Sequence, residues 1–139
     1  MTSAREPQAP NSAIEIVRCI YDALDDGDTR TPQKYFREDV EAYVSDFLPW
    51  GGLMKGLGAF TEGFVTMTRH VRIAFEPEEL IDAGDNVIAM GRSVGIVHAT
   101  GQPFSIRTVQ VWRVEGDKVV AVAFYHDREL ATYLTAAAA

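Results

Sequence analysis

Residues 86–98 read NVIAMGRSVGIVH, and residues 104–115 follow with FSIRTVQVWRVE. In both segments neighbouring side chains alternate between two kinds, which is the period of a β-strand. Gly101 stands between them, where a three-residue hairpin loop favours a left-handed residue. A third alternating segment, KVVAVAFYH at residues 118–126, comes after another glycine-containing turn. The three segments predict an antiparallel meander, and this meander decides the fold.

The chain before the meander carries helical patterns. Ser12 and Glu15 have capping-box spacing, which predicts a helix that ends near Gly27. Thr31 followed by a proline predicts a second, short helix with the threonine as its cap. Apolar side chains at helical spacing over residues 57–67 predict a third. Helices followed by a strand meander indicate the α+β class, with three N-terminal helices packed on a mostly antiparallel sheet.

The length of 139 residues predicts one domain. We expect a flexible tail over residues 1–11, where two prolines stand among small polar residues, and an ordered domain over residues 12–135. The last residues, 136–139, are all alanine and predict a C-terminal tail.

The composition of the chain limits the kinds of binding partner that we expect. The formal net charge of -7 argues against nucleic acids and anionic membranes, which need a cationic face, so we expect a small, neutral and apolar ligand. The one cysteine, Cys19, has no partner for an internal disulfide, which is typical of a cytoplasmic protein. The sequence contains no metal-ligand spacing, phosphate loop or nucleophile triad, so we expect neither metal nor organic cofactor.

The two faces of each predicted strand differ in kind. In residues 86–98 one face is bulky and apolar with Arg92 in its middle, while the other is made of small residues. In the next strand Thr108 and Gln110 interrupt an apolar face, and in the last strand His126 does so. Three strands thus share one design, an apolar wall with isolated polar groups, and this design predicts a pocket.

The hairpin loops set how these groups align. A three-residue loop at Gly101 places Arg92 opposite Thr108, with Gln110 diagonal to it. A three-residue loop at the second hairpin places Phe124 opposite Thr108 and His126 opposite Ile106. With these registers the four polar groups share one patch.

A buried guanidinium needs partners for its hydrogen bonds and its charge, and two interpretations of the patch supply them. In the first, a carboxylate such as Asp46, Glu41 or Asp127 neutralises Arg92. In the second, the polar groups line a cavity and meet a ligand there. His126 or Asp46 would then move a proton, while Arg92 and Gln110 would stabilise an oxyanion.

Apolar and aromatic residues around these groups are the candidate substrate-binding set. They are Tyr21, Trp50, Phe60, Phe64, Met90, Val94, Thr108, Trp112 and Phe124.

Several short motifs together carry a family resemblance over residues 12–135. They include Tyr21-Asp22-Ala23-Leu24, Leu48-Pro49-Trp50-Gly51-Gly52, Gly84-Asp85-Asn86-Val87 and Tyr125-His126-Asp127. In order and spacing the chain resembles SnoaL-like proteins of the NTF2-like fold. The resemblance implies a cone of helices against a curved sheet that encloses an apolar pocket, often dimeric through the outer sheet face. It also implies kinship with polyketide cyclases, ketosteroid isomerases and epoxide hydrolases.

The catalytic residues of these relatives do not carry over. The two acids of the isomerase align near Val44 and Gln110, and the epoxide hydrolase pattern keeps Arg92 but needs acids at Val94 and Phe124. The function therefore stays open between a cofactor-independent isomerase, cyclase or hydrolase and a non-catalytic binding module. A third possibility is a structural homodimer, which the outer stripe of Val109 and Val111 suggests.

Overall fold

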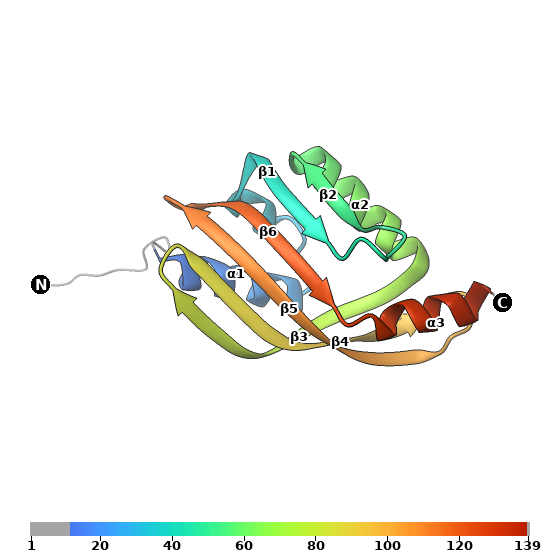
Figure 1. The fold of residues 1–139 in the computed structure, drawn as a ribbon. Coiled ribbons are helices and arrows are strands. Elements are labelled where there is room, and N and C mark those ends of the chain that lie inside the picture. The colour runs from blue at the N-terminus through green and yellow to red at the C-terminus, as the bar shows by residue number, and fades with distance from the viewer. Residues whose placement is uncertain (1–11, 139) are drawn as a thin grey trace, which may run out of the picture.

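The structure is a computed structural model that describes residues 12–138 (Figure 1). The predicted tail at residues 1–11 lies outside the described residues. In chain order the elements are α1 (Ala13–Asp25), the 3-10 helix η1 (Thr31–Tyr35), β1 (Phe36–Val44), β2 (Gly52–Lys55), α2 (Leu57–His70), β3 (Val71–Ala83), β4 (Asn86–Val97), β5 (Pro103–Glu115), β6 (Lys118–His126) and α3 (Glu129–Ala138).

One curved, unclosed sheet of six strands has the order β2-β1-β6-β5-β4-β3. β1 runs parallel to β6, and every other neighbouring pair is antiparallel. α1 and α2 lie behind the sheet in the view of Figure 1. Leu130 of α3 packs with Phe104 and Ile106. The fold is α+β as predicted, although one of its three α-helices is C-terminal rather than N-terminal.

The first helices begin where local chemistry satisfies their free backbone N–H groups. The Ser12 side chain accepts from the N–H of Glu15 and the Glu15 side chain from that of Ser12, so the predicted capping box is confirmed. The predicted Thr31 cap is wrong. The Asp28 carboxylate accepts from the N–H groups of Arg30 and Thr31 instead, and the turn that follows is a 3-10 helix.

β4 turns its small residues inward and its bulky residues outward, the reverse of the predicted orientation. A Cβ atom on Gly91 would meet the backbone carbonyl oxygen of Glu76, and one on Gly95 would meet that of Arg72. The backbone of β3 therefore comes so close to this face that only glycine fits. Curvature of the sheet, rather than hydrophobicity, decides which face of β4 points inward.

The loop between β4 and β5 is longer than the predicted three residues, because the backbone N–H of Val97 donates to the carbonyl oxygen of Gln102 and leaves residues 98–101 between them. Arg92 consequently pairs with Arg107, and Gly91 pairs with Thr108. The predicted pairing of Arg92 with Thr108 is wrong by one residue. A slip of one residue moves a side chain to the other face of the sheet.

The second hairpin differs from its prediction by two residues. Glu115 pairs with Lys118 around a tight turn, and an irregularity between Arg113 and Val114 shifts the register further. His126 therefore lies opposite Thr108, and Phe124 lies opposite Gln110. An even shift keeps each side chain on its face, so His126 and Phe124 point inward as predicted.

The core has two apolar clusters at opposite ends of the inner sheet face. In the first, Ile16 and Ile20 of α1 pack on Val87 and Trp112. In the second, Leu130 covers Val97, Phe104 and Ile106. Along β5, Thr108 and Gln110 stand between Ile106 and Trp112. The polar groups of the inner face therefore lie between the two clusters.

Within residues 12–138, no helix has the length and apolar character needed to cross a membrane. The same part of the chain holds no group of three or more His, Cys, Asp or Glu side chains arranged to bind a metal ion.

Candidate ligand site on the inner face

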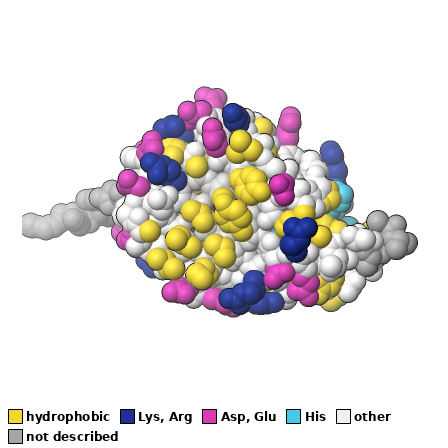
Figure 2. All heavy atoms as spheres, in the orientation of Figure 1, with side chains coloured by type: hydrophobic (Ala, Val, Ile, Leu, Met, Phe, Trp, Pro, Cys, Tyr) yellow, Lys and Arg dark blue, Asp and Glu magenta, His cyan; other side chains and the backbone are white. Residues whose placement is uncertain are grey.

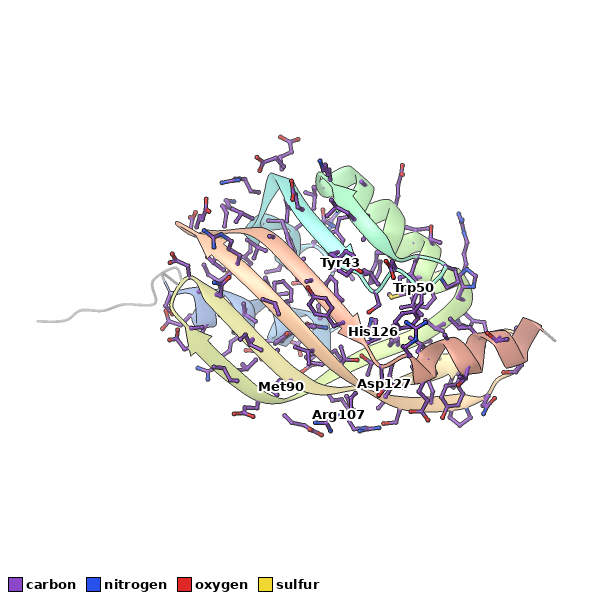
Figure 3. The ribbon with its side chains drawn as sticks, in the orientation of Figure 1. Tyr43, Trp50, Met90, Arg107, His126 and Asp127 are labelled. Atoms are coloured by element: carbon purple, nitrogen blue, oxygen red, sulfur yellow. The ribbon has the colours of Figure 1, made fainter. Side chains whose placement is uncertain are left out.

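Polar and aromatic side chains meet in the middle of the inner sheet face. They come from α1, β4, β5 and β6, and Figure 3 labels His126 at the end of β6. We call this group the inner-face site, and its members are Tyr21, Ser93, Thr108, Gln110, Trp112, Phe124 and His126.

Three of these residues form a hydrogen-bonded chain that joins α1 to β5. The indole N–H of Trp112 donates to the Tyr21 hydroxyl over 2.9 Å, and this hydroxyl donates to Oε1 of Gln110 over 2.6 Å. Burial raises the pKa of Tyr21 above its usual range, and the hydrogen bond from Trp112 opposes part of that rise. The Tyr21 phenol therefore stays neutral and holds the Gln110 side chain in place.

A second chain crosses three strands. Oγ of Ser93 lies 2.7 Å from Oγ1 of Thr108, which lies 3.0 Å from Nδ1 of His126. The backbone N–H of His126 donates to Oγ of Ser45 over 3.0 Å. Burial lowers the pKa of His126 to about 4, so the ring is neutral at neutral pH.

Aromatic rings surround both chains. The Phe124 ring centroid lies 6.0 Å from that of Phe60 and 6.1 Å from that of Trp112, while Tyr21 and Phe75 rings are 5.7 Å apart. Phe60, Phe75 and Phe124 all keep part of their surface exposed. Partly exposed apolar rings therefore lie next to the polar groups.

The outer face of β4 carries three predicted site residues. Arg92 donates from Nε to Oγ of Ser105 over 2.7 Å and from Nη2 to the Ser105 carbonyl oxygen over 2.9 Å. Met90 pairs with Val109 and Val94 with Ser105, also on the outer face. The predicted patch that joins Arg92 to Thr108 and Gln110 is therefore wrong, and a neighbouring strand rather than a carboxylate satisfies the guanidinium.

Three further predicted residues lie away from the inner-face site. Asp46 is exposed in the turn after β1, and its carboxylate makes no hydrogen bond or ion pair to residues 12–138. Trp50 is buried in the second core cluster, 5.7 Å from the His70 ring, and its indole N–H has no partner in the described part of the chain. Phe64 on α2 is 50% exposed.

Ser93 is a member of the inner-face site and Phe75 lies beside it, next to Tyr21, although the sequence pattern singled out neither residue. Phe75 pairs with Ser93 across β3 and β4, so both point inward. The glycines at positions 91 and 95 flank Ser93 on the small-residue face. Two glycines on one face of a strand, here four residues apart, are a signal that another backbone comes close to that face.

The outer sheet face is apolar and hollowed. Figure 2 shows apolar side chains gathered over β4, β5 and β6, with charged side chains around them. A groove of roughly 310 Å³ lies in this face. We call it the outer groove, and it is lined by Glu41, Tyr43, Leu53, Asn86, Val111, Arg113, Ala121, Val122, Ala123 and Tyr125.

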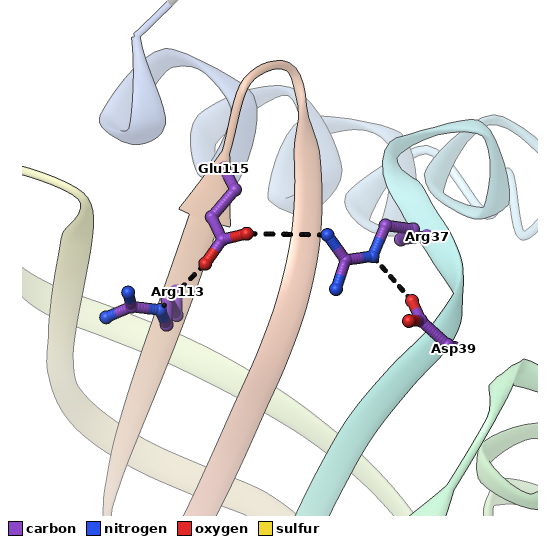
Figure 4. A network of polar contacts seen from close by, with 4 residues as sticks. All are labelled: Arg37, Asp39, Arg113 and Glu115. Atoms are coloured by element: carbon purple, nitrogen blue, oxygen red, sulfur yellow. Dashed lines mark hydrogen bonds and ion pairs between the residues drawn. The ribbon is translucent and has the colours of Figure 1, made fainter.

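Charged side chains pair near one end of this groove (Figure 4). Glu115 meets Nη1 of Arg37 at 3.4 Å and Nε of Arg113 at 3.3 Å, and Arg37 also pairs with Asp39. The bond to Arg37 lowers the pKa of Asp39. The network joins β1 to the hairpin of β5 and β6.

Solved structures of the NTF2-like class share this architecture. An NTF2-like protein from Burkholderia thailandensis is 26% identical, with a TM-score of 0.83 over 91% of this chain and 98% of that chain. TerC, solved with polyporic acid, is 20% identical with a TM-score of 0.78 over 88% and 96% of the two chains. A predicted SnoaL-like polyketide cyclase from Mesorhizobium loti is 20% identical, with a TM-score of 0.68 over 81% and 97%.

The fold is therefore that of the NTF2-like proteins. The family model of the SnoaL-like domain matches residues 17–122, and the chain belongs to this family, which confirms the resemblance seen in its motifs. No curated protein matches the sequence significantly.

Proposed function

We propose that this SnoaL-like protein binds a small, neutral and largely apolar molecule against the inner-face site. One observation carries the proposal. The partly exposed rings of Phe60, Phe75 and Phe124 stand beside two polar side chains, Gln110 and His126, that each keep one nitrogen without a partner among residues 12–138. Apolar walls with a few convergent polar groups are the usual composition of a small-molecule site.

Similar proteins support this choice. TerC, which has the same fold, was crystallised with polyporic acid, and other structural neighbours are described as polyketide cyclases. In this chain His126 and Tyr21 are the titratable side chains of the inner-face site, and the Tyr21 hydroxyl is occupied by Gln110 and Trp112. His126 is therefore the group through which cofactor-independent acid–base chemistry would run.

NMR with 2-ethylnaphthalene tests the site, because this probe is neutral, apolar and has no hydrogen-bonding group. We expect nuclear Overhauser contacts from the naphthyl protons to Phe124 and Phe60. A matched control is the outer groove, where Tyr43 and Tyr125 should show none. Contacts confined to the outer groove, or no binding at all, would contradict the proposal.

Catalysis is measured separately, with enones, epoxides and polyketide aldehydes as substrates. Turnover that is lost in His126→Phe and kept in Arg92→Ala would establish an enzyme. Binding without turnover of any substrate would leave a ligand-binding module.

A second proposal concerns assembly, and the outer groove carries it. Leu53 and Tyr125 are 57% and 48% exposed there, an apolar surface that a second copy of this chain would cover. Glu41 and Arg113 give the groove both signs of charge. In a two-fold dimer the same surface meets itself, so Arg113 of one copy can face Glu41 of the other.

Sedimentation of the full chain tests the dimer. We expect a dimer at micromolar concentration and a monomer for Tyr125→Lys, because a buried lysine without a partner opposes association. Val65→Lys on α2 places the same charge at a side chain that is 46% exposed, and it should remain dimeric. A monomeric wild-type protein would contradict the proposal.

A further inference from the structure

The chain of Ser93, Thr108 and His126 has a direction that can be worked out from its protons. The Ser93 and Thr108 side chains are each 1% exposed, so water does not replace a missing partner. Each hydroxyl has one hydrogen to donate. Among residues 12–138, Thr108 is the side-chain partner of the Ser93 hydroxyl.

If Ser93 donates to Thr108 and Thr108 donates to Nδ1 of His126, every hydroxyl hydrogen has an acceptor. In the opposite direction His126 donates from Nδ1 to Thr108 and Thr108 donates to Ser93. The Ser93 hydrogen then has no acceptor within the described residues, and a buried donor without a partner is costly. The first direction is favoured, so Nδ1 of His126 is an acceptor and the ring proton lies on Nε2.

The hydrogen-bonded chain of Trp112, Tyr21 and Gln110 also ends in a free donor. An indole N–H can only donate, so Tyr21 accepts from Trp112 and must donate its own hydrogen to Gln110. The amide of Gln110 therefore uses its oxygen, and its two N–H hydrogens remain available. Gln110 lies diagonal to His126 across β5 and β6, a separation of roughly 7–8 Å between backbones that long side chains can bridge.

We propose that Ser93 and Thr108 are positioning residues that hold His126 as an Nε2–H donor, and that this donor and the Gln110 amide together select a ligand with a carbonyl oxygen. The inference rests on the proposed function and deepens it, because it names the class of ligand: neutral ketones, aldehydes or quinones on an apolar frame. Both polar ends of the site donate, so a ligand whose polar group can only donate, such as an indole N–H, is disfavoured.

The direction of the hydrogen bonds from Ser93 through Thr108 to His126 is tested first, without ligand, by ¹⁵N NMR of the His126 ring at pH 7. Wild type should show the tautomer with the proton on Nε2. Thr108→Val removes the donor to Nδ1 and should mix the two tautomers, whereas Thr108→Ser keeps a hydroxyl and should restore the wild-type spectrum. Ser93→Ala removes the donor to Thr108 and should weaken the preference. A wild-type ring protonated on Nδ1 overturns the inference.

The preference for a carbonyl oxygen is tested with a matched pair of ligands, 2-acetylnaphthalene and 2-ethylnaphthalene, of which only the first carries a carbonyl oxygen. We expect wild type to bind the ketone about tenfold more tightly, the size of one net hydrogen bond. Gln110→Leu and His126→Phe should each reduce this ratio. Equal affinities in wild type overturn the inference and leave the proposed function standing. Binding of neither compound defeats the proposed function itself and, with it, the ligand class.

Discussion

The hydroxyl of Tyr21 in α1 lies 2.6 Å from Oε1 of Gln110 in β5, at a separation of 89 positions in the sequence. This bond anchors the first helix to the middle of the sheet. It also orients the one amide of the inner-face site, so a single hydrogen bond serves both the fold and the site.

Tyr21→Phe should destabilise the protein by about 1–3 kcal/mol, because Oε1 of Gln110 and the indole N–H of Trp112 both lose their partner. Urea unfolding measures the change. Tyr43→Phe is the control, since no hydrogen bond of the Tyr43 hydroxyl to residues 12–138 is found, and it should change stability by less than about 0.5 kcal/mol. Equal effects of the two variants would show that the bond contributes nothing.

His126 should make stability depend on pH. The pKa of His126 is about 4 in the folded protein against 6.5 for a free histidine. Between these two pH values the unfolded chain therefore binds a proton that the folded protein does not bind. The stability due to this difference is complete above pH 6.5 and is lost as pH falls toward 4.

Unfolding free energies at pH 7 and pH 5 for wild type and His126→Gln measure this. Wild type should lose about 2 kcal/mol more than the variant over this interval. The subtraction cancels carboxylates that titrate in both proteins. An equal loss of unfolding free energy in wild type and His126→Gln would contradict the prediction and indicate that the His126 ring is exposed to solvent.

Gly91→Ala should destabilise the protein by about 1–3 kcal/mol or prevent folding, because the added methyl group meets the backbone of β3. Gly58→Ala in α2 is the opposite case. A Cβ atom there meets nothing within 4 Å, and alanine favours a helix by up to about 1 kcal/mol over glycine. Thermal unfolding should therefore move in opposite directions for the two variants, and a Gly91→Ala protein as stable as wild type would contradict the close approach of β3.

Arg92→Ala should bind 2-acetylnaphthalene as wild type does, because the Arg92 guanidinium is held by Ser105 on the outer face. Gln110→Leu has nearly the same volume but loses the inner amide, and it should bind several-fold more weakly. Calorimetric titration compares the two. Loss of binding in Arg92→Ala alone would indicate that the ligand binds on the outer face of the sheet.

Much of the architecture could be predicted from the sequence. The period of the strands, the capping box at Ser12 and the glycine turns are local signals, and each corresponds to an observed element. The face of β4 could not be predicted this way. Hydrophobicity predicts that the face of β4 with Met90 and Arg92 points inward. The bend of the sheet leaves room on its inner side only for small residues, so the opposite face points inward.

Only part of the inner-face site could be predicted, because the strand registers differ from the predicted ones. His126, Thr108 and Gln110 come together because an even error in register preserves the face, while an odd error moved Arg92 away from them. Loop length and an irregularity near Val114 decide these registers. Neither is visible in the alternation of side chains.

The parallel pairing of β1 with β6 also governs when the protein can fold. Val44 pairs with Phe124, so the β1–β2 hairpin finds its place in the sheet only after β6 has left the ribosome. Contacts between segments so distant in sequence slow folding, because the intervening chain must be ordered first. Until β6 emerges, the hairpin exposes an unpaired edge, and nascent chains halted before that point are the ones a chaperone would be expected to hold.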